Sequence, residues 1–288
     1  MRISKVLLLM LLALAPVVAS ATGQAADIIY IDGQQWWLMG RAVTFLDSAH
    51  YDILVSHLPE NRSQSTANWD GYIGYWSLDG DILILDSVVC EVYNDYEHKE
   101  YHEESLPKEV MQEVFGNYYH NGRIEATFVT WENIRVTQGQ RLYYEHSGWE
   151  RFYETELILK VEQGRVVNRT LYHNRVVVDG FCFDDLSFEG LDKFREEFAP
   201  VLRKYHELDT VGKVYFSMNH WTIDTLGNMT DVEVKAICRC HEDILPQLAM
   251  EFKQYILNIR PWKIWYINGE YTHIYRGWNI PFRRQDWD

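Results

Sequence analysis

The chain has 288 residues, of which 47% are hydrophobic and 24% are charged, a composition typical of a folded protein with room for two modest domains. Its formal net charge is -15, and the sequence has no block of Lys or Arg. The release of counterions that drives nucleic-acid binding is therefore missing, and the same charge sign opposes adsorption to an anionic lipid surface. Composition thus argues against nucleic acid as a partner.

The first residues, 1–21, have the layout of a secretory signal peptide. Arg2 and Lys5 precede an apolar run from Val6 to Val18, and the small residues Ala19-Ser20-Ala21 follow as a cleavage site. This run is shorter than the roughly twenty residues that span a bilayer. We expect export to the periplasm or cell envelope and no membrane span in the mature chain, with an uncleaved anchor as the alternative.

Residues 27–183 predict a β-rich domain built mainly from antiparallel hairpins. Asp32-Gly33, Asp79-Gly80 and Gln163-Gly164 each lie between strand-like runs, and His173-Asn174 is a further turn candidate. One exception is a short predicted helix with Ser105 as its cap, Pro107 in its first turn and Gly116 as its stop. A sandwich or a barrel-like sheet fits this pattern.

Residues 184–208 change to helical spacing, which predicts a helical connector interrupted by Pro200. Residues 209–288 then predict a small β-β-α-β domain, so the fold class is α+β. Its first strand alternates through Val214, Phe216 and Met218, and the shift of phase before Trp221 indicates a bulge. A turn at residues 226–228, a helix over 242–259 and a final hairpin at residues 268–269, with its last strand running from Ile274 to Phe282, complete this domain.

An ordered series of motifs follows from about Asp209 to Arg283: GKVYFSM, IDTLGNMTDVEV, an amphipathic helix, PWKIWYINGEY and a terminal IPFR. In this order they resemble the C-terminal domain of TonB-type energy transducers. The resemblance implies the fold of this domain and a habit of binding peptide segments of outer-membrane receptors by adding a strand to the sheet edge. The sequence departs from the family at Ile264, where Pro is usual, and it has no long Pro-rich spacer. Energy transduction itself is therefore not implied.

Five aromatic residues are the candidate binding residues of the sequence. Flat rings with polar rims suit the faces of sugars, although core packing is the alternative for each ring. Trp265 and Tyr266 face opposite sides of a strand, and Trp262 is expected to anchor the end of the preceding helix. The five candidates are Trp37, Trp69, Trp76, Trp265 and Tyr266.

The cysteines are candidates for disulfides, because an exported chain folds in an oxidising compartment. Four cysteines allow three pairings, which sequence alone leaves open. A metal site made from the CRC motif and His241 would need further ligands at a recognisable spacing, and we find none. The four residues are Cys90, Cys182, Cys238 and Cys240.

Catalytic motifs are not evident. His98 and His102 lie among several glutamates, but their order matches no zinc-protease motif, and an acidic solvated loop is the simpler interpretation. No serine-nucleophile or phosphate-loop motif occurs. Carboxylates that could face one another across a cleft, as sugar hydrolysis requires, are Asp70, Asp79, Asp81, Glu91 and Glu145.

These observations predict an exported, non-catalytic binding or adaptor protein without a cofactor. Its expected partner is an outer-membrane receptor or another envelope protein, bound by strand addition and linked to transport across that membrane. The alternative is a β-rich binder of glycan or peptidoglycan that uses the N-terminal aromatics. A secreted hydrolase is a third hypothesis, and it names no catalytic residue.

Overall fold

The computed structural model describes residues 23–144, 148–239, 242–273 and 277–288. The predicted signal segment lies outside the described residues. The chain forms two compact units, which divide between Tyr172 and His173. Among the described residues, the helices are too short or too polar to cross a bilayer. The coarse prediction of a mixed α+β fold dominated by antiparallel strands is confirmed.

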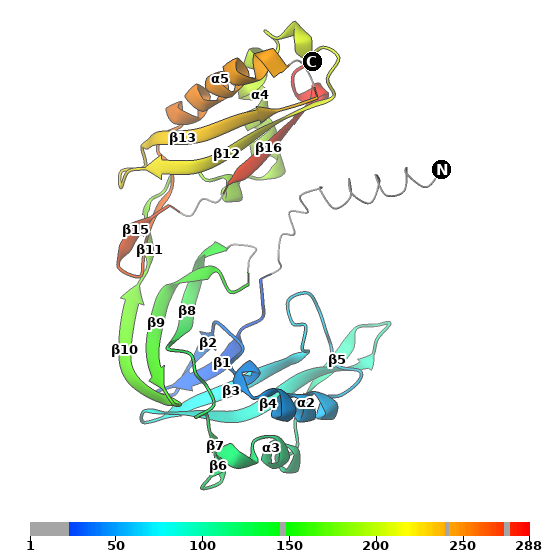
Figure 1. Cartoon of the computed structure of the whole chain (residues 1–288), viewed down its shortest axis with the longest axis vertical. Coiled ribbons are helices and arrows are strands. Elements are labelled where there is room, and N and C mark those ends of the chain that lie inside the picture. The colour runs from blue at the N-terminus through cyan, green and yellow to red at the C-terminus, as the bar shows by residue number, and fades with distance from the viewer. Residues whose placement is uncertain (1–22, 145–147, 240–241, 274–276) are drawn as a thin grey trace. The chain divides into compact units, whose positions relative to one another are not determined.

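The N-terminal unit is built on one large sheet with two helices (Figure 1). Its strands run in the order β10-β9-β8-β2-β1-β3-β4-β7-β6, with β5 paired to β4. The elements are β1 (Asp27–Ile31), β2 (Gln34–Leu38), α2 (Ser48–His57), β3 (Tyr72–Asp79), β4 (Ile82–Asp95), β5 (Glu100–Ser105), α3 (Lys108–Val114), β6 (Tyr119–His120), β7 (Arg123–Glu125), β8 (Asn133–Tyr144), β9 (Arg151–Glu162) and β10 (Arg165–His173).

This sheet closes on itself at one end. Arg165 at the start of β10 pairs with Ile82 at the start of β4, and the N–H of Leu83 donates to the carbonyl oxygen of Gly164 at 2.8 Å. Closure turns seven strands into a barrel-like layer around a core of aliphatic and aromatic side chains. One pairing differs from the expected antiparallel pattern, because β1 and β3 run parallel.

Turn residues explain why the hairpins form where the sequence predicts them. Asp32 and Gly33 both have positive φ, as do Gln163 and Gly164, so each pair forms the tight turn that Gly permits. The helix expected after Ser105 is confirmed as α3, but Pro107 is its N-cap and Ser105 ends β5. Proline suits the start of a helix because the first N–H groups have no intrahelical partner.

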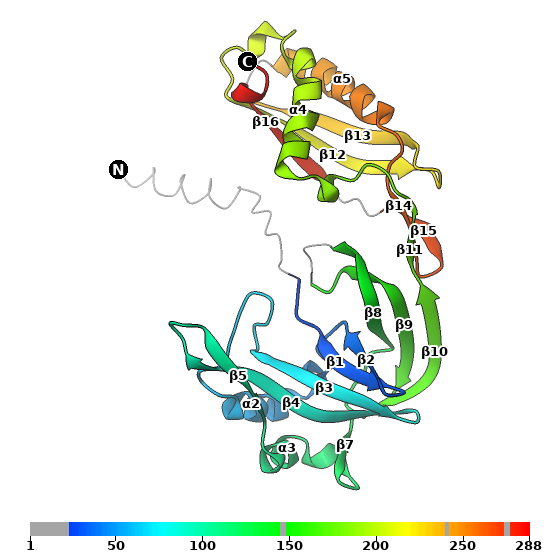
Figure 2. The same ribbon diagram turned by 180° about the vertical axis from the view of Figure 1, so that it is seen from behind.

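The C-terminal unit contains two small sheets and two long helices. Its elements are β11 (Arg175–Val178), α4 (Phe188–Leu202), β12 (Lys213–Ile223), β13 (Met229–Ile237), α5 (Leu245–Asn258), β14 (Ile264–Ile267), β15 (Glu270–Thr272) and β16 (Trp278–Arg283). One sheet has the order β13-β12-β16 and the other the order β11-β14-β15. Helices α4 and α5 cover one face of the first sheet, so that α4 lies behind it in Figure 1 and in front of it in Figure 2.

The core of this unit is aromatic. Phe216 of β12 stacks on Phe252 of α5 with ring centroids 4.0 Å apart and meets Phe198 of α4 edge-on at 5.5 Å. Trp262 is fully buried and packs edge-on against Trp221 and Phe181. The segment expected to be a connector therefore supplies α4 to this core.

Two local predictions in this unit hold and two need correction. The bulge after Met218 and the turn at residues 224–228 are present, with His220 and Gly227 at positive φ. His173-Asn174 does not close a hairpin, because β11 pairs with β14. Asn268-Gly269 turns the short hairpin β14–β15, whereas the last strand, β16, pairs with β12. Part of the expected last strand, at Ile274, lies outside the described residues.

Candidate functional site

The two edges of the β13-β12-β16 sheet differ in how they are covered. On β16, Pro281 has no N–H to offer, and its carbonyl oxygen accepts a hydrogen bond at 3.0 Å from Nε of Arg195 in α4. Proline and a side-chain cap both block pairing with a further strand. On β13, no described strand pairs with the outer edge. β13 is therefore the edge of this sheet that can accept a partner strand.

The end of β13 borders a pocket on the sheet face opposite the helices. Its volume is about 490 Å³, within the range of small-ligand and peptide side-chain pockets. Tyr215 and Ile237, which lie directly opposite each other in register, expose apolar surface in it. Its lining residues are Thr210, Val211, Gly212, Lys213, Tyr215, Ile237, Cys238 and Arg239.

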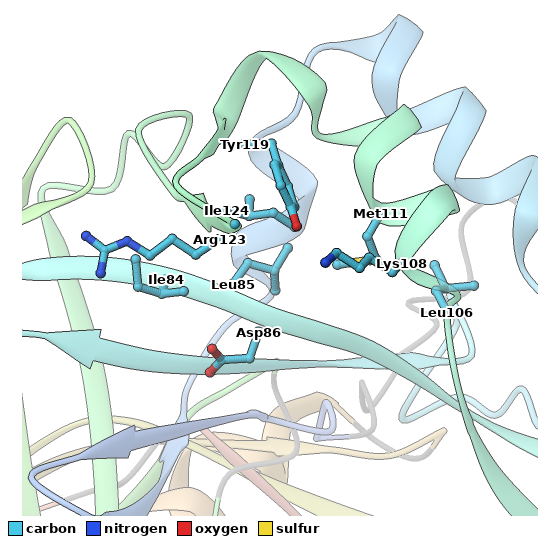
Figure 3. A pocket seen from close by; sticks show the side chains of 10 residues that line it. Ile84, Leu85, Asp86, Leu106, Lys108, Met111, Tyr119, Arg123 and Ile124 are labelled. Carbon is cyan, nitrogen blue, oxygen red and sulfur yellow. The ribbon is translucent and has the colours of Figure 1, made fainter.

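A second pocket of about 380 Å³ lies in the N-terminal unit, between β4, α3 and the β6–β7 hairpin (Figure 3). Figure 3 shows Lys108 and Tyr119 projecting over Leu85, while Arg123 points away. The guanidinium of Arg123 instead pairs with Asp79 and with Glu125. The floor is apolar and buried, and consists of Ile84, Leu85, Leu106, Met111 and Ile124. Asp86 also lines this pocket, which can therefore hold a small apolar group beside one amine and one carboxylate.

A buried ionic network lies in the core of the N-terminal unit. Asp27 is 0% exposed, and its Oδ1 is 3.4 Å from Nε of Arg41, which is 5% exposed. The indole Nε1 of Trp76 donates to Oδ2 of Asp27 at 3.0 Å, and the N–H of Gly74 donates to Oδ1 at 3.1 Å. Burial raises the pKa of Asp27 from 3.8 to about 6, although Arg41 and the two hydrogen bonds lower it.

The same arginine joins this network to the surface. Nη1 of Arg41 donates to the carbonyl oxygen of Tyr72 at 2.7 Å and lies 3.6 Å from Oδ2 of Asp70, and the hydroxyl of Tyr51 donates to Oδ1 of Asp70 at 3.0 Å. Because the central pair has almost no exposed surface, we assign the network to core structure rather than to a reaction site.

The five aromatic candidates lie in different environments. Trp76 is completely buried and Trp265 is 1% exposed, so both belong to the cores. Tyr266 is half-buried, with the guanidinium of Arg175 4.6 Å from its ring centroid. Trp69 is 69% exposed, and Trp37 is 38% exposed. The structure therefore does not gather the five rings into one surface.

The two exposed tryptophans belong to separate features. Trp37 on β2 packs beside Tyr153 on β9 with ring centroids 5.2 Å apart. Trp69 lies in the loop between α2 and β3. The pair of Trp37 and Tyr153 is thus a small aromatic platform made by two strands.

The two histidines of the acidic segment lie in different elements. His98 lies in the β4–β5 turn, where its Nδ1 is 2.6 Å from Oδ2 of Asp95, and His102 lies on β5. The two histidines are therefore not one helical turn apart. Among the described residues, no three His, Cys, Asp or Glu side chains form a metal-binding group. His241 and Glu145 lie outside the described residues.

Three of the four cysteines can be placed. Cys90 and Cys182 are buried free thiols, which corrects the expectation that either takes part in a disulfide. Burial raises the pKa of each thiol to about 11, so both are poor nucleophiles. Cys238 is disulfide-bonded, and Cys240 lies outside the described residues.

Sequence reasoning did not single out the residues at the end of β13. Alternation in β12 contains the signal, because residues between the buried Val214, Phe216 and Met218 must face away from the core. Only the sheet order places Tyr215 beside Ile237.

No known family model matches the chain, and neither a curated protein nor a solved structure matches it.

Proposed function

We propose that the protein is an exported, non-catalytic adaptor that binds an envelope protein by accepting a partner strand along β13. The observation that carries the proposal is the difference between the two sheet edges. β16 is covered at Pro281 by Arg195, whereas the outer edge of β13 has no partner strand among the described residues. Main-chain hydrogen bonds to an added strand provide affinity without any particular catalytic group.

The partner class follows from the sequence. A secretory signal would deliver the chain to the envelope, and the resemblance of residues 209–288 to the TonB C-terminal domain supports an outer-membrane receptor or another envelope protein as partner. Binding of this kind would link the protein to transport across that membrane.

A photo-crosslinking experiment tests the role of β13. The photoreactive residue p-benzoylphenylalanine replaces Lys235 on β13 in one variant and the exposed Glu196 on α4 in a control. After irradiation in envelope extract, the β13 variant should yield a defined conjugate that the α4 control does not. If neither variant yields a conjugate, or both yield the same one, strand addition at β13 is wrong.

A second function, glycan binding by the N-terminal unit, is favoured by the pair of Trp37 and Tyr153. Two adjacent aromatic faces can stack on a sugar ring. Wild type should then be retained by peptidoglycan or another polysaccharide, and Trp37→Ala should lose this retention. Trp69→Ala tests the other exposed tryptophan. Lack of retention of wild type would reject the glycan hypothesis.

A further inference from the structure

The β13-β12-β16 sheet has one face that the helices α4 and α5 do not cover. Val214, Phe216 and Met218 of β12 point into the core, so Lys213, Tyr215 and Ser217 point to the opposite face. The same alternation holds in the neighbouring strands, where Val232 of β13 and Ile280 and Phe282 of β16 are buried. The side chains on the uncovered face include Lys213, Tyr215, Ser217, Asn219, Glu233, Lys235, Ile237, Asn279, Pro281 and Arg283.

Strand register arranges these side chains in rows across the sheet. Tyr215 lies opposite Ile237 of β13 on one side and opposite Pro281 of β16 on the other. These three residues form an apolar row that crosses all three strands. Next to it, Lys213 lies opposite Arg283. Arg239 follows Ile237 by two residues and lines the same pocket as Lys213.

Three cations, Lys213, Arg239 and Arg283, gather at this end of the face. No ion pair within the described chain involves Lys213, Arg239 or Arg283, whereas Lys235 lies 3.7 Å from a carboxylate oxygen of Glu233. Nζ of Lys213 instead lies 4.4 Å from the ring centroid of Tyr215. Among the described residues, the lining of the pocket includes no Asp or Glu. The carboxylate of Asp286 accepts a hydrogen bond from the backbone N–H of Arg283 at 2.6 Å. In a chain of net charge -15, a group of three cations without a side-chain ion pair among the described residues is still a local exception.

We infer that this face recognises an acidic segment of the partner protein. A carboxylate of that segment would lie against Lys213, Arg239 and Arg283, and an apolar side chain would lie against Tyr215, Ile237 and Pro281. The inference rests on the proposed function, because a strand added to β13 presents every second side chain to this face. Such side chains would lie beside Ile237 and Arg239, at the mouth of the pocket. Charge complementarity of this kind selects among partners and accelerates association more than it adds affinity.

Synthetic peptides test the charge requirement. The probe is a fluorescein-labelled peptide of repeating Thr-Val-Thr-Glu, which places Val and Glu on the same face of a strand. Matched peptides replace Glu by Gln or by Lys. By fluorescence anisotropy at low salt, wild type should bind the Glu peptide about tenfold more tightly than the Lys peptide, and salt should reduce the difference.

Variants locate the effect on the protein. Lys213→Glu combined with Arg239→Glu should reverse the preference, so that the Lys peptide binds more tightly than the Glu peptide. Lys193→Glu combined with Lys99→Glu makes the same change of net charge at exposed positions elsewhere and should keep the wild-type preference. Circular dichroism checks that each variant is folded.

The outcomes separate this inference from the proposed function. Equal affinity of wild type for the three peptides, or binding of none of them, overturns the inference. It is also overturned if Lys235-directed crosslinking captures the same envelope protein in wild-type and Lys213→Glu, Arg239→Glu backgrounds; this result would leave the proposed function standing. Absence of any conjugate in the wild-type background overturns the proposed function itself.

Discussion

The two units of the protein stabilise their cores in different ways. In the N-terminal unit, Asp27, Arg41 and Glu156 are buried charged residues, whereas Asn174 is the one buried polar residue of the described C-terminal unit. The C-terminal core instead contains a group of interlocking phenylalanine and tryptophan rings among its aliphatic side chains. In the N-terminal core, buried charged groups need hydrogen-bond and ionic partners in place of water. In the C-terminal core, aromatic rings need neighbours of complementary shape.

This difference changes what each unit responds to. Two buried charges lose their hydration, and their mutual attraction offsets this loss only when their geometry is good. The contribution of the pair to the free energy of unfolding therefore depends on pH and on both partners. Aromatic packing depends on volume and contact, neither of which titrates. Each core also contains one buried free thiol, Cys90 in the N-terminal unit and Cys182 in the C-terminal unit, whose alkylation reports opening of that unit alone.

The largest expected effect is that of Trp262→Ala. Removing a fully buried indole that packs against Trp221 and Phe181 should destabilise the C-terminal unit by about 3–5 kcal/mol. Cys182 should then react with iodoacetamide much faster, while Cys90 keeps its wild-type rate. If the C-terminal unit stayed folded while partner binding was lost, Trp262 would belong to a ligand surface.

A somewhat smaller effect is expected for Arg41→Ala in the other core. It leaves the buried carboxylate of Asp27 without its cation, which should cost about 3 kcal/mol near neutral pH. Cys90 should become reactive and Cys182 should not. Arg165→Ala, which removes an exposed ion pair with Asp81, is the matched control and should cost less than about 0.5 kcal/mol. Equal effects of the two variants would contradict a structural role of the buried pair.

The pH dependence of the N-terminal unit should be next in size. Because the pKa of Asp27 is raised from 3.8 in the unfolded chain to about 6 in the folded one, the folded state binds the proton more tightly. This stabilisation is complete below about pH 4 and is lost as the pH rises through about 6, a change of about 1–3 kcal/mol. Denaturation of wild type and Asp27→Asn from pH 4 to pH 7 measures it, because other carboxylates contribute equally to both.

The C-terminal unit should show the opposite slope in acid. Hydrogen bonds from Asn228 lower the pKa of Asp224, and Lys253 lowers that of Asp231. Their contributions are present above the unfolded pKa and are lost as the pH falls. The alkylation rate of Cys182, divided at each pH by its rate in the unfolded chain to remove the loss of thiolate, should therefore rise slightly towards acid pH. If the stability of the N-terminal unit were the same in wild type and Asp27→Asn at every pH, Asp27 would not cause its pH dependence. The two units would then not differ in this respect.

The smallest effect is expected for Trp69→Ala. Its side chain is 69% exposed, so its loss should change the stability of the N-terminal unit by less than about 0.5 kcal/mol and leave the reactivity of both thiols unchanged. Thermal unfolding and alkylation measure this. A large loss of stability would mean that the loop carrying Trp69 packs into the core.

Local features of the fold could be predicted from the sequence because local physics produces them. Asp32-Gly33, Gln163-Gly164 and Asn268-Gly269 form turns since their residues tolerate positive φ. The stripe of apolar residues over 242–259 predicts α5, and alternation predicts which residues of β12 are buried. Each of these patterns is complete within a few residues of the chain.

Pairings between distant segments could not be predicted in this way. The barrel-like sheet closes where Arg165 pairs with Ile82, and β11 pairs with β14. The local sequence pattern of each of these strands does not indicate which strand it pairs with. The expected final hairpin failed for this reason: Asn268-Gly269 does turn the chain, but β16 pairs with β12.

For the candidate site, the sequence by itself determined the alternation that turns Lys213 and Tyr215 away from the core, since side chains of a strand must point to opposite faces in turn. Only the tertiary structure decided that Ile237 lies beside Tyr215, that Arg283 lies beside Lys213, and that no other described strand pairs with the outer edge of β13. These relations depend on which strands pair and in what register, and that choice is made by burial of the whole core rather than by any short stretch of sequence.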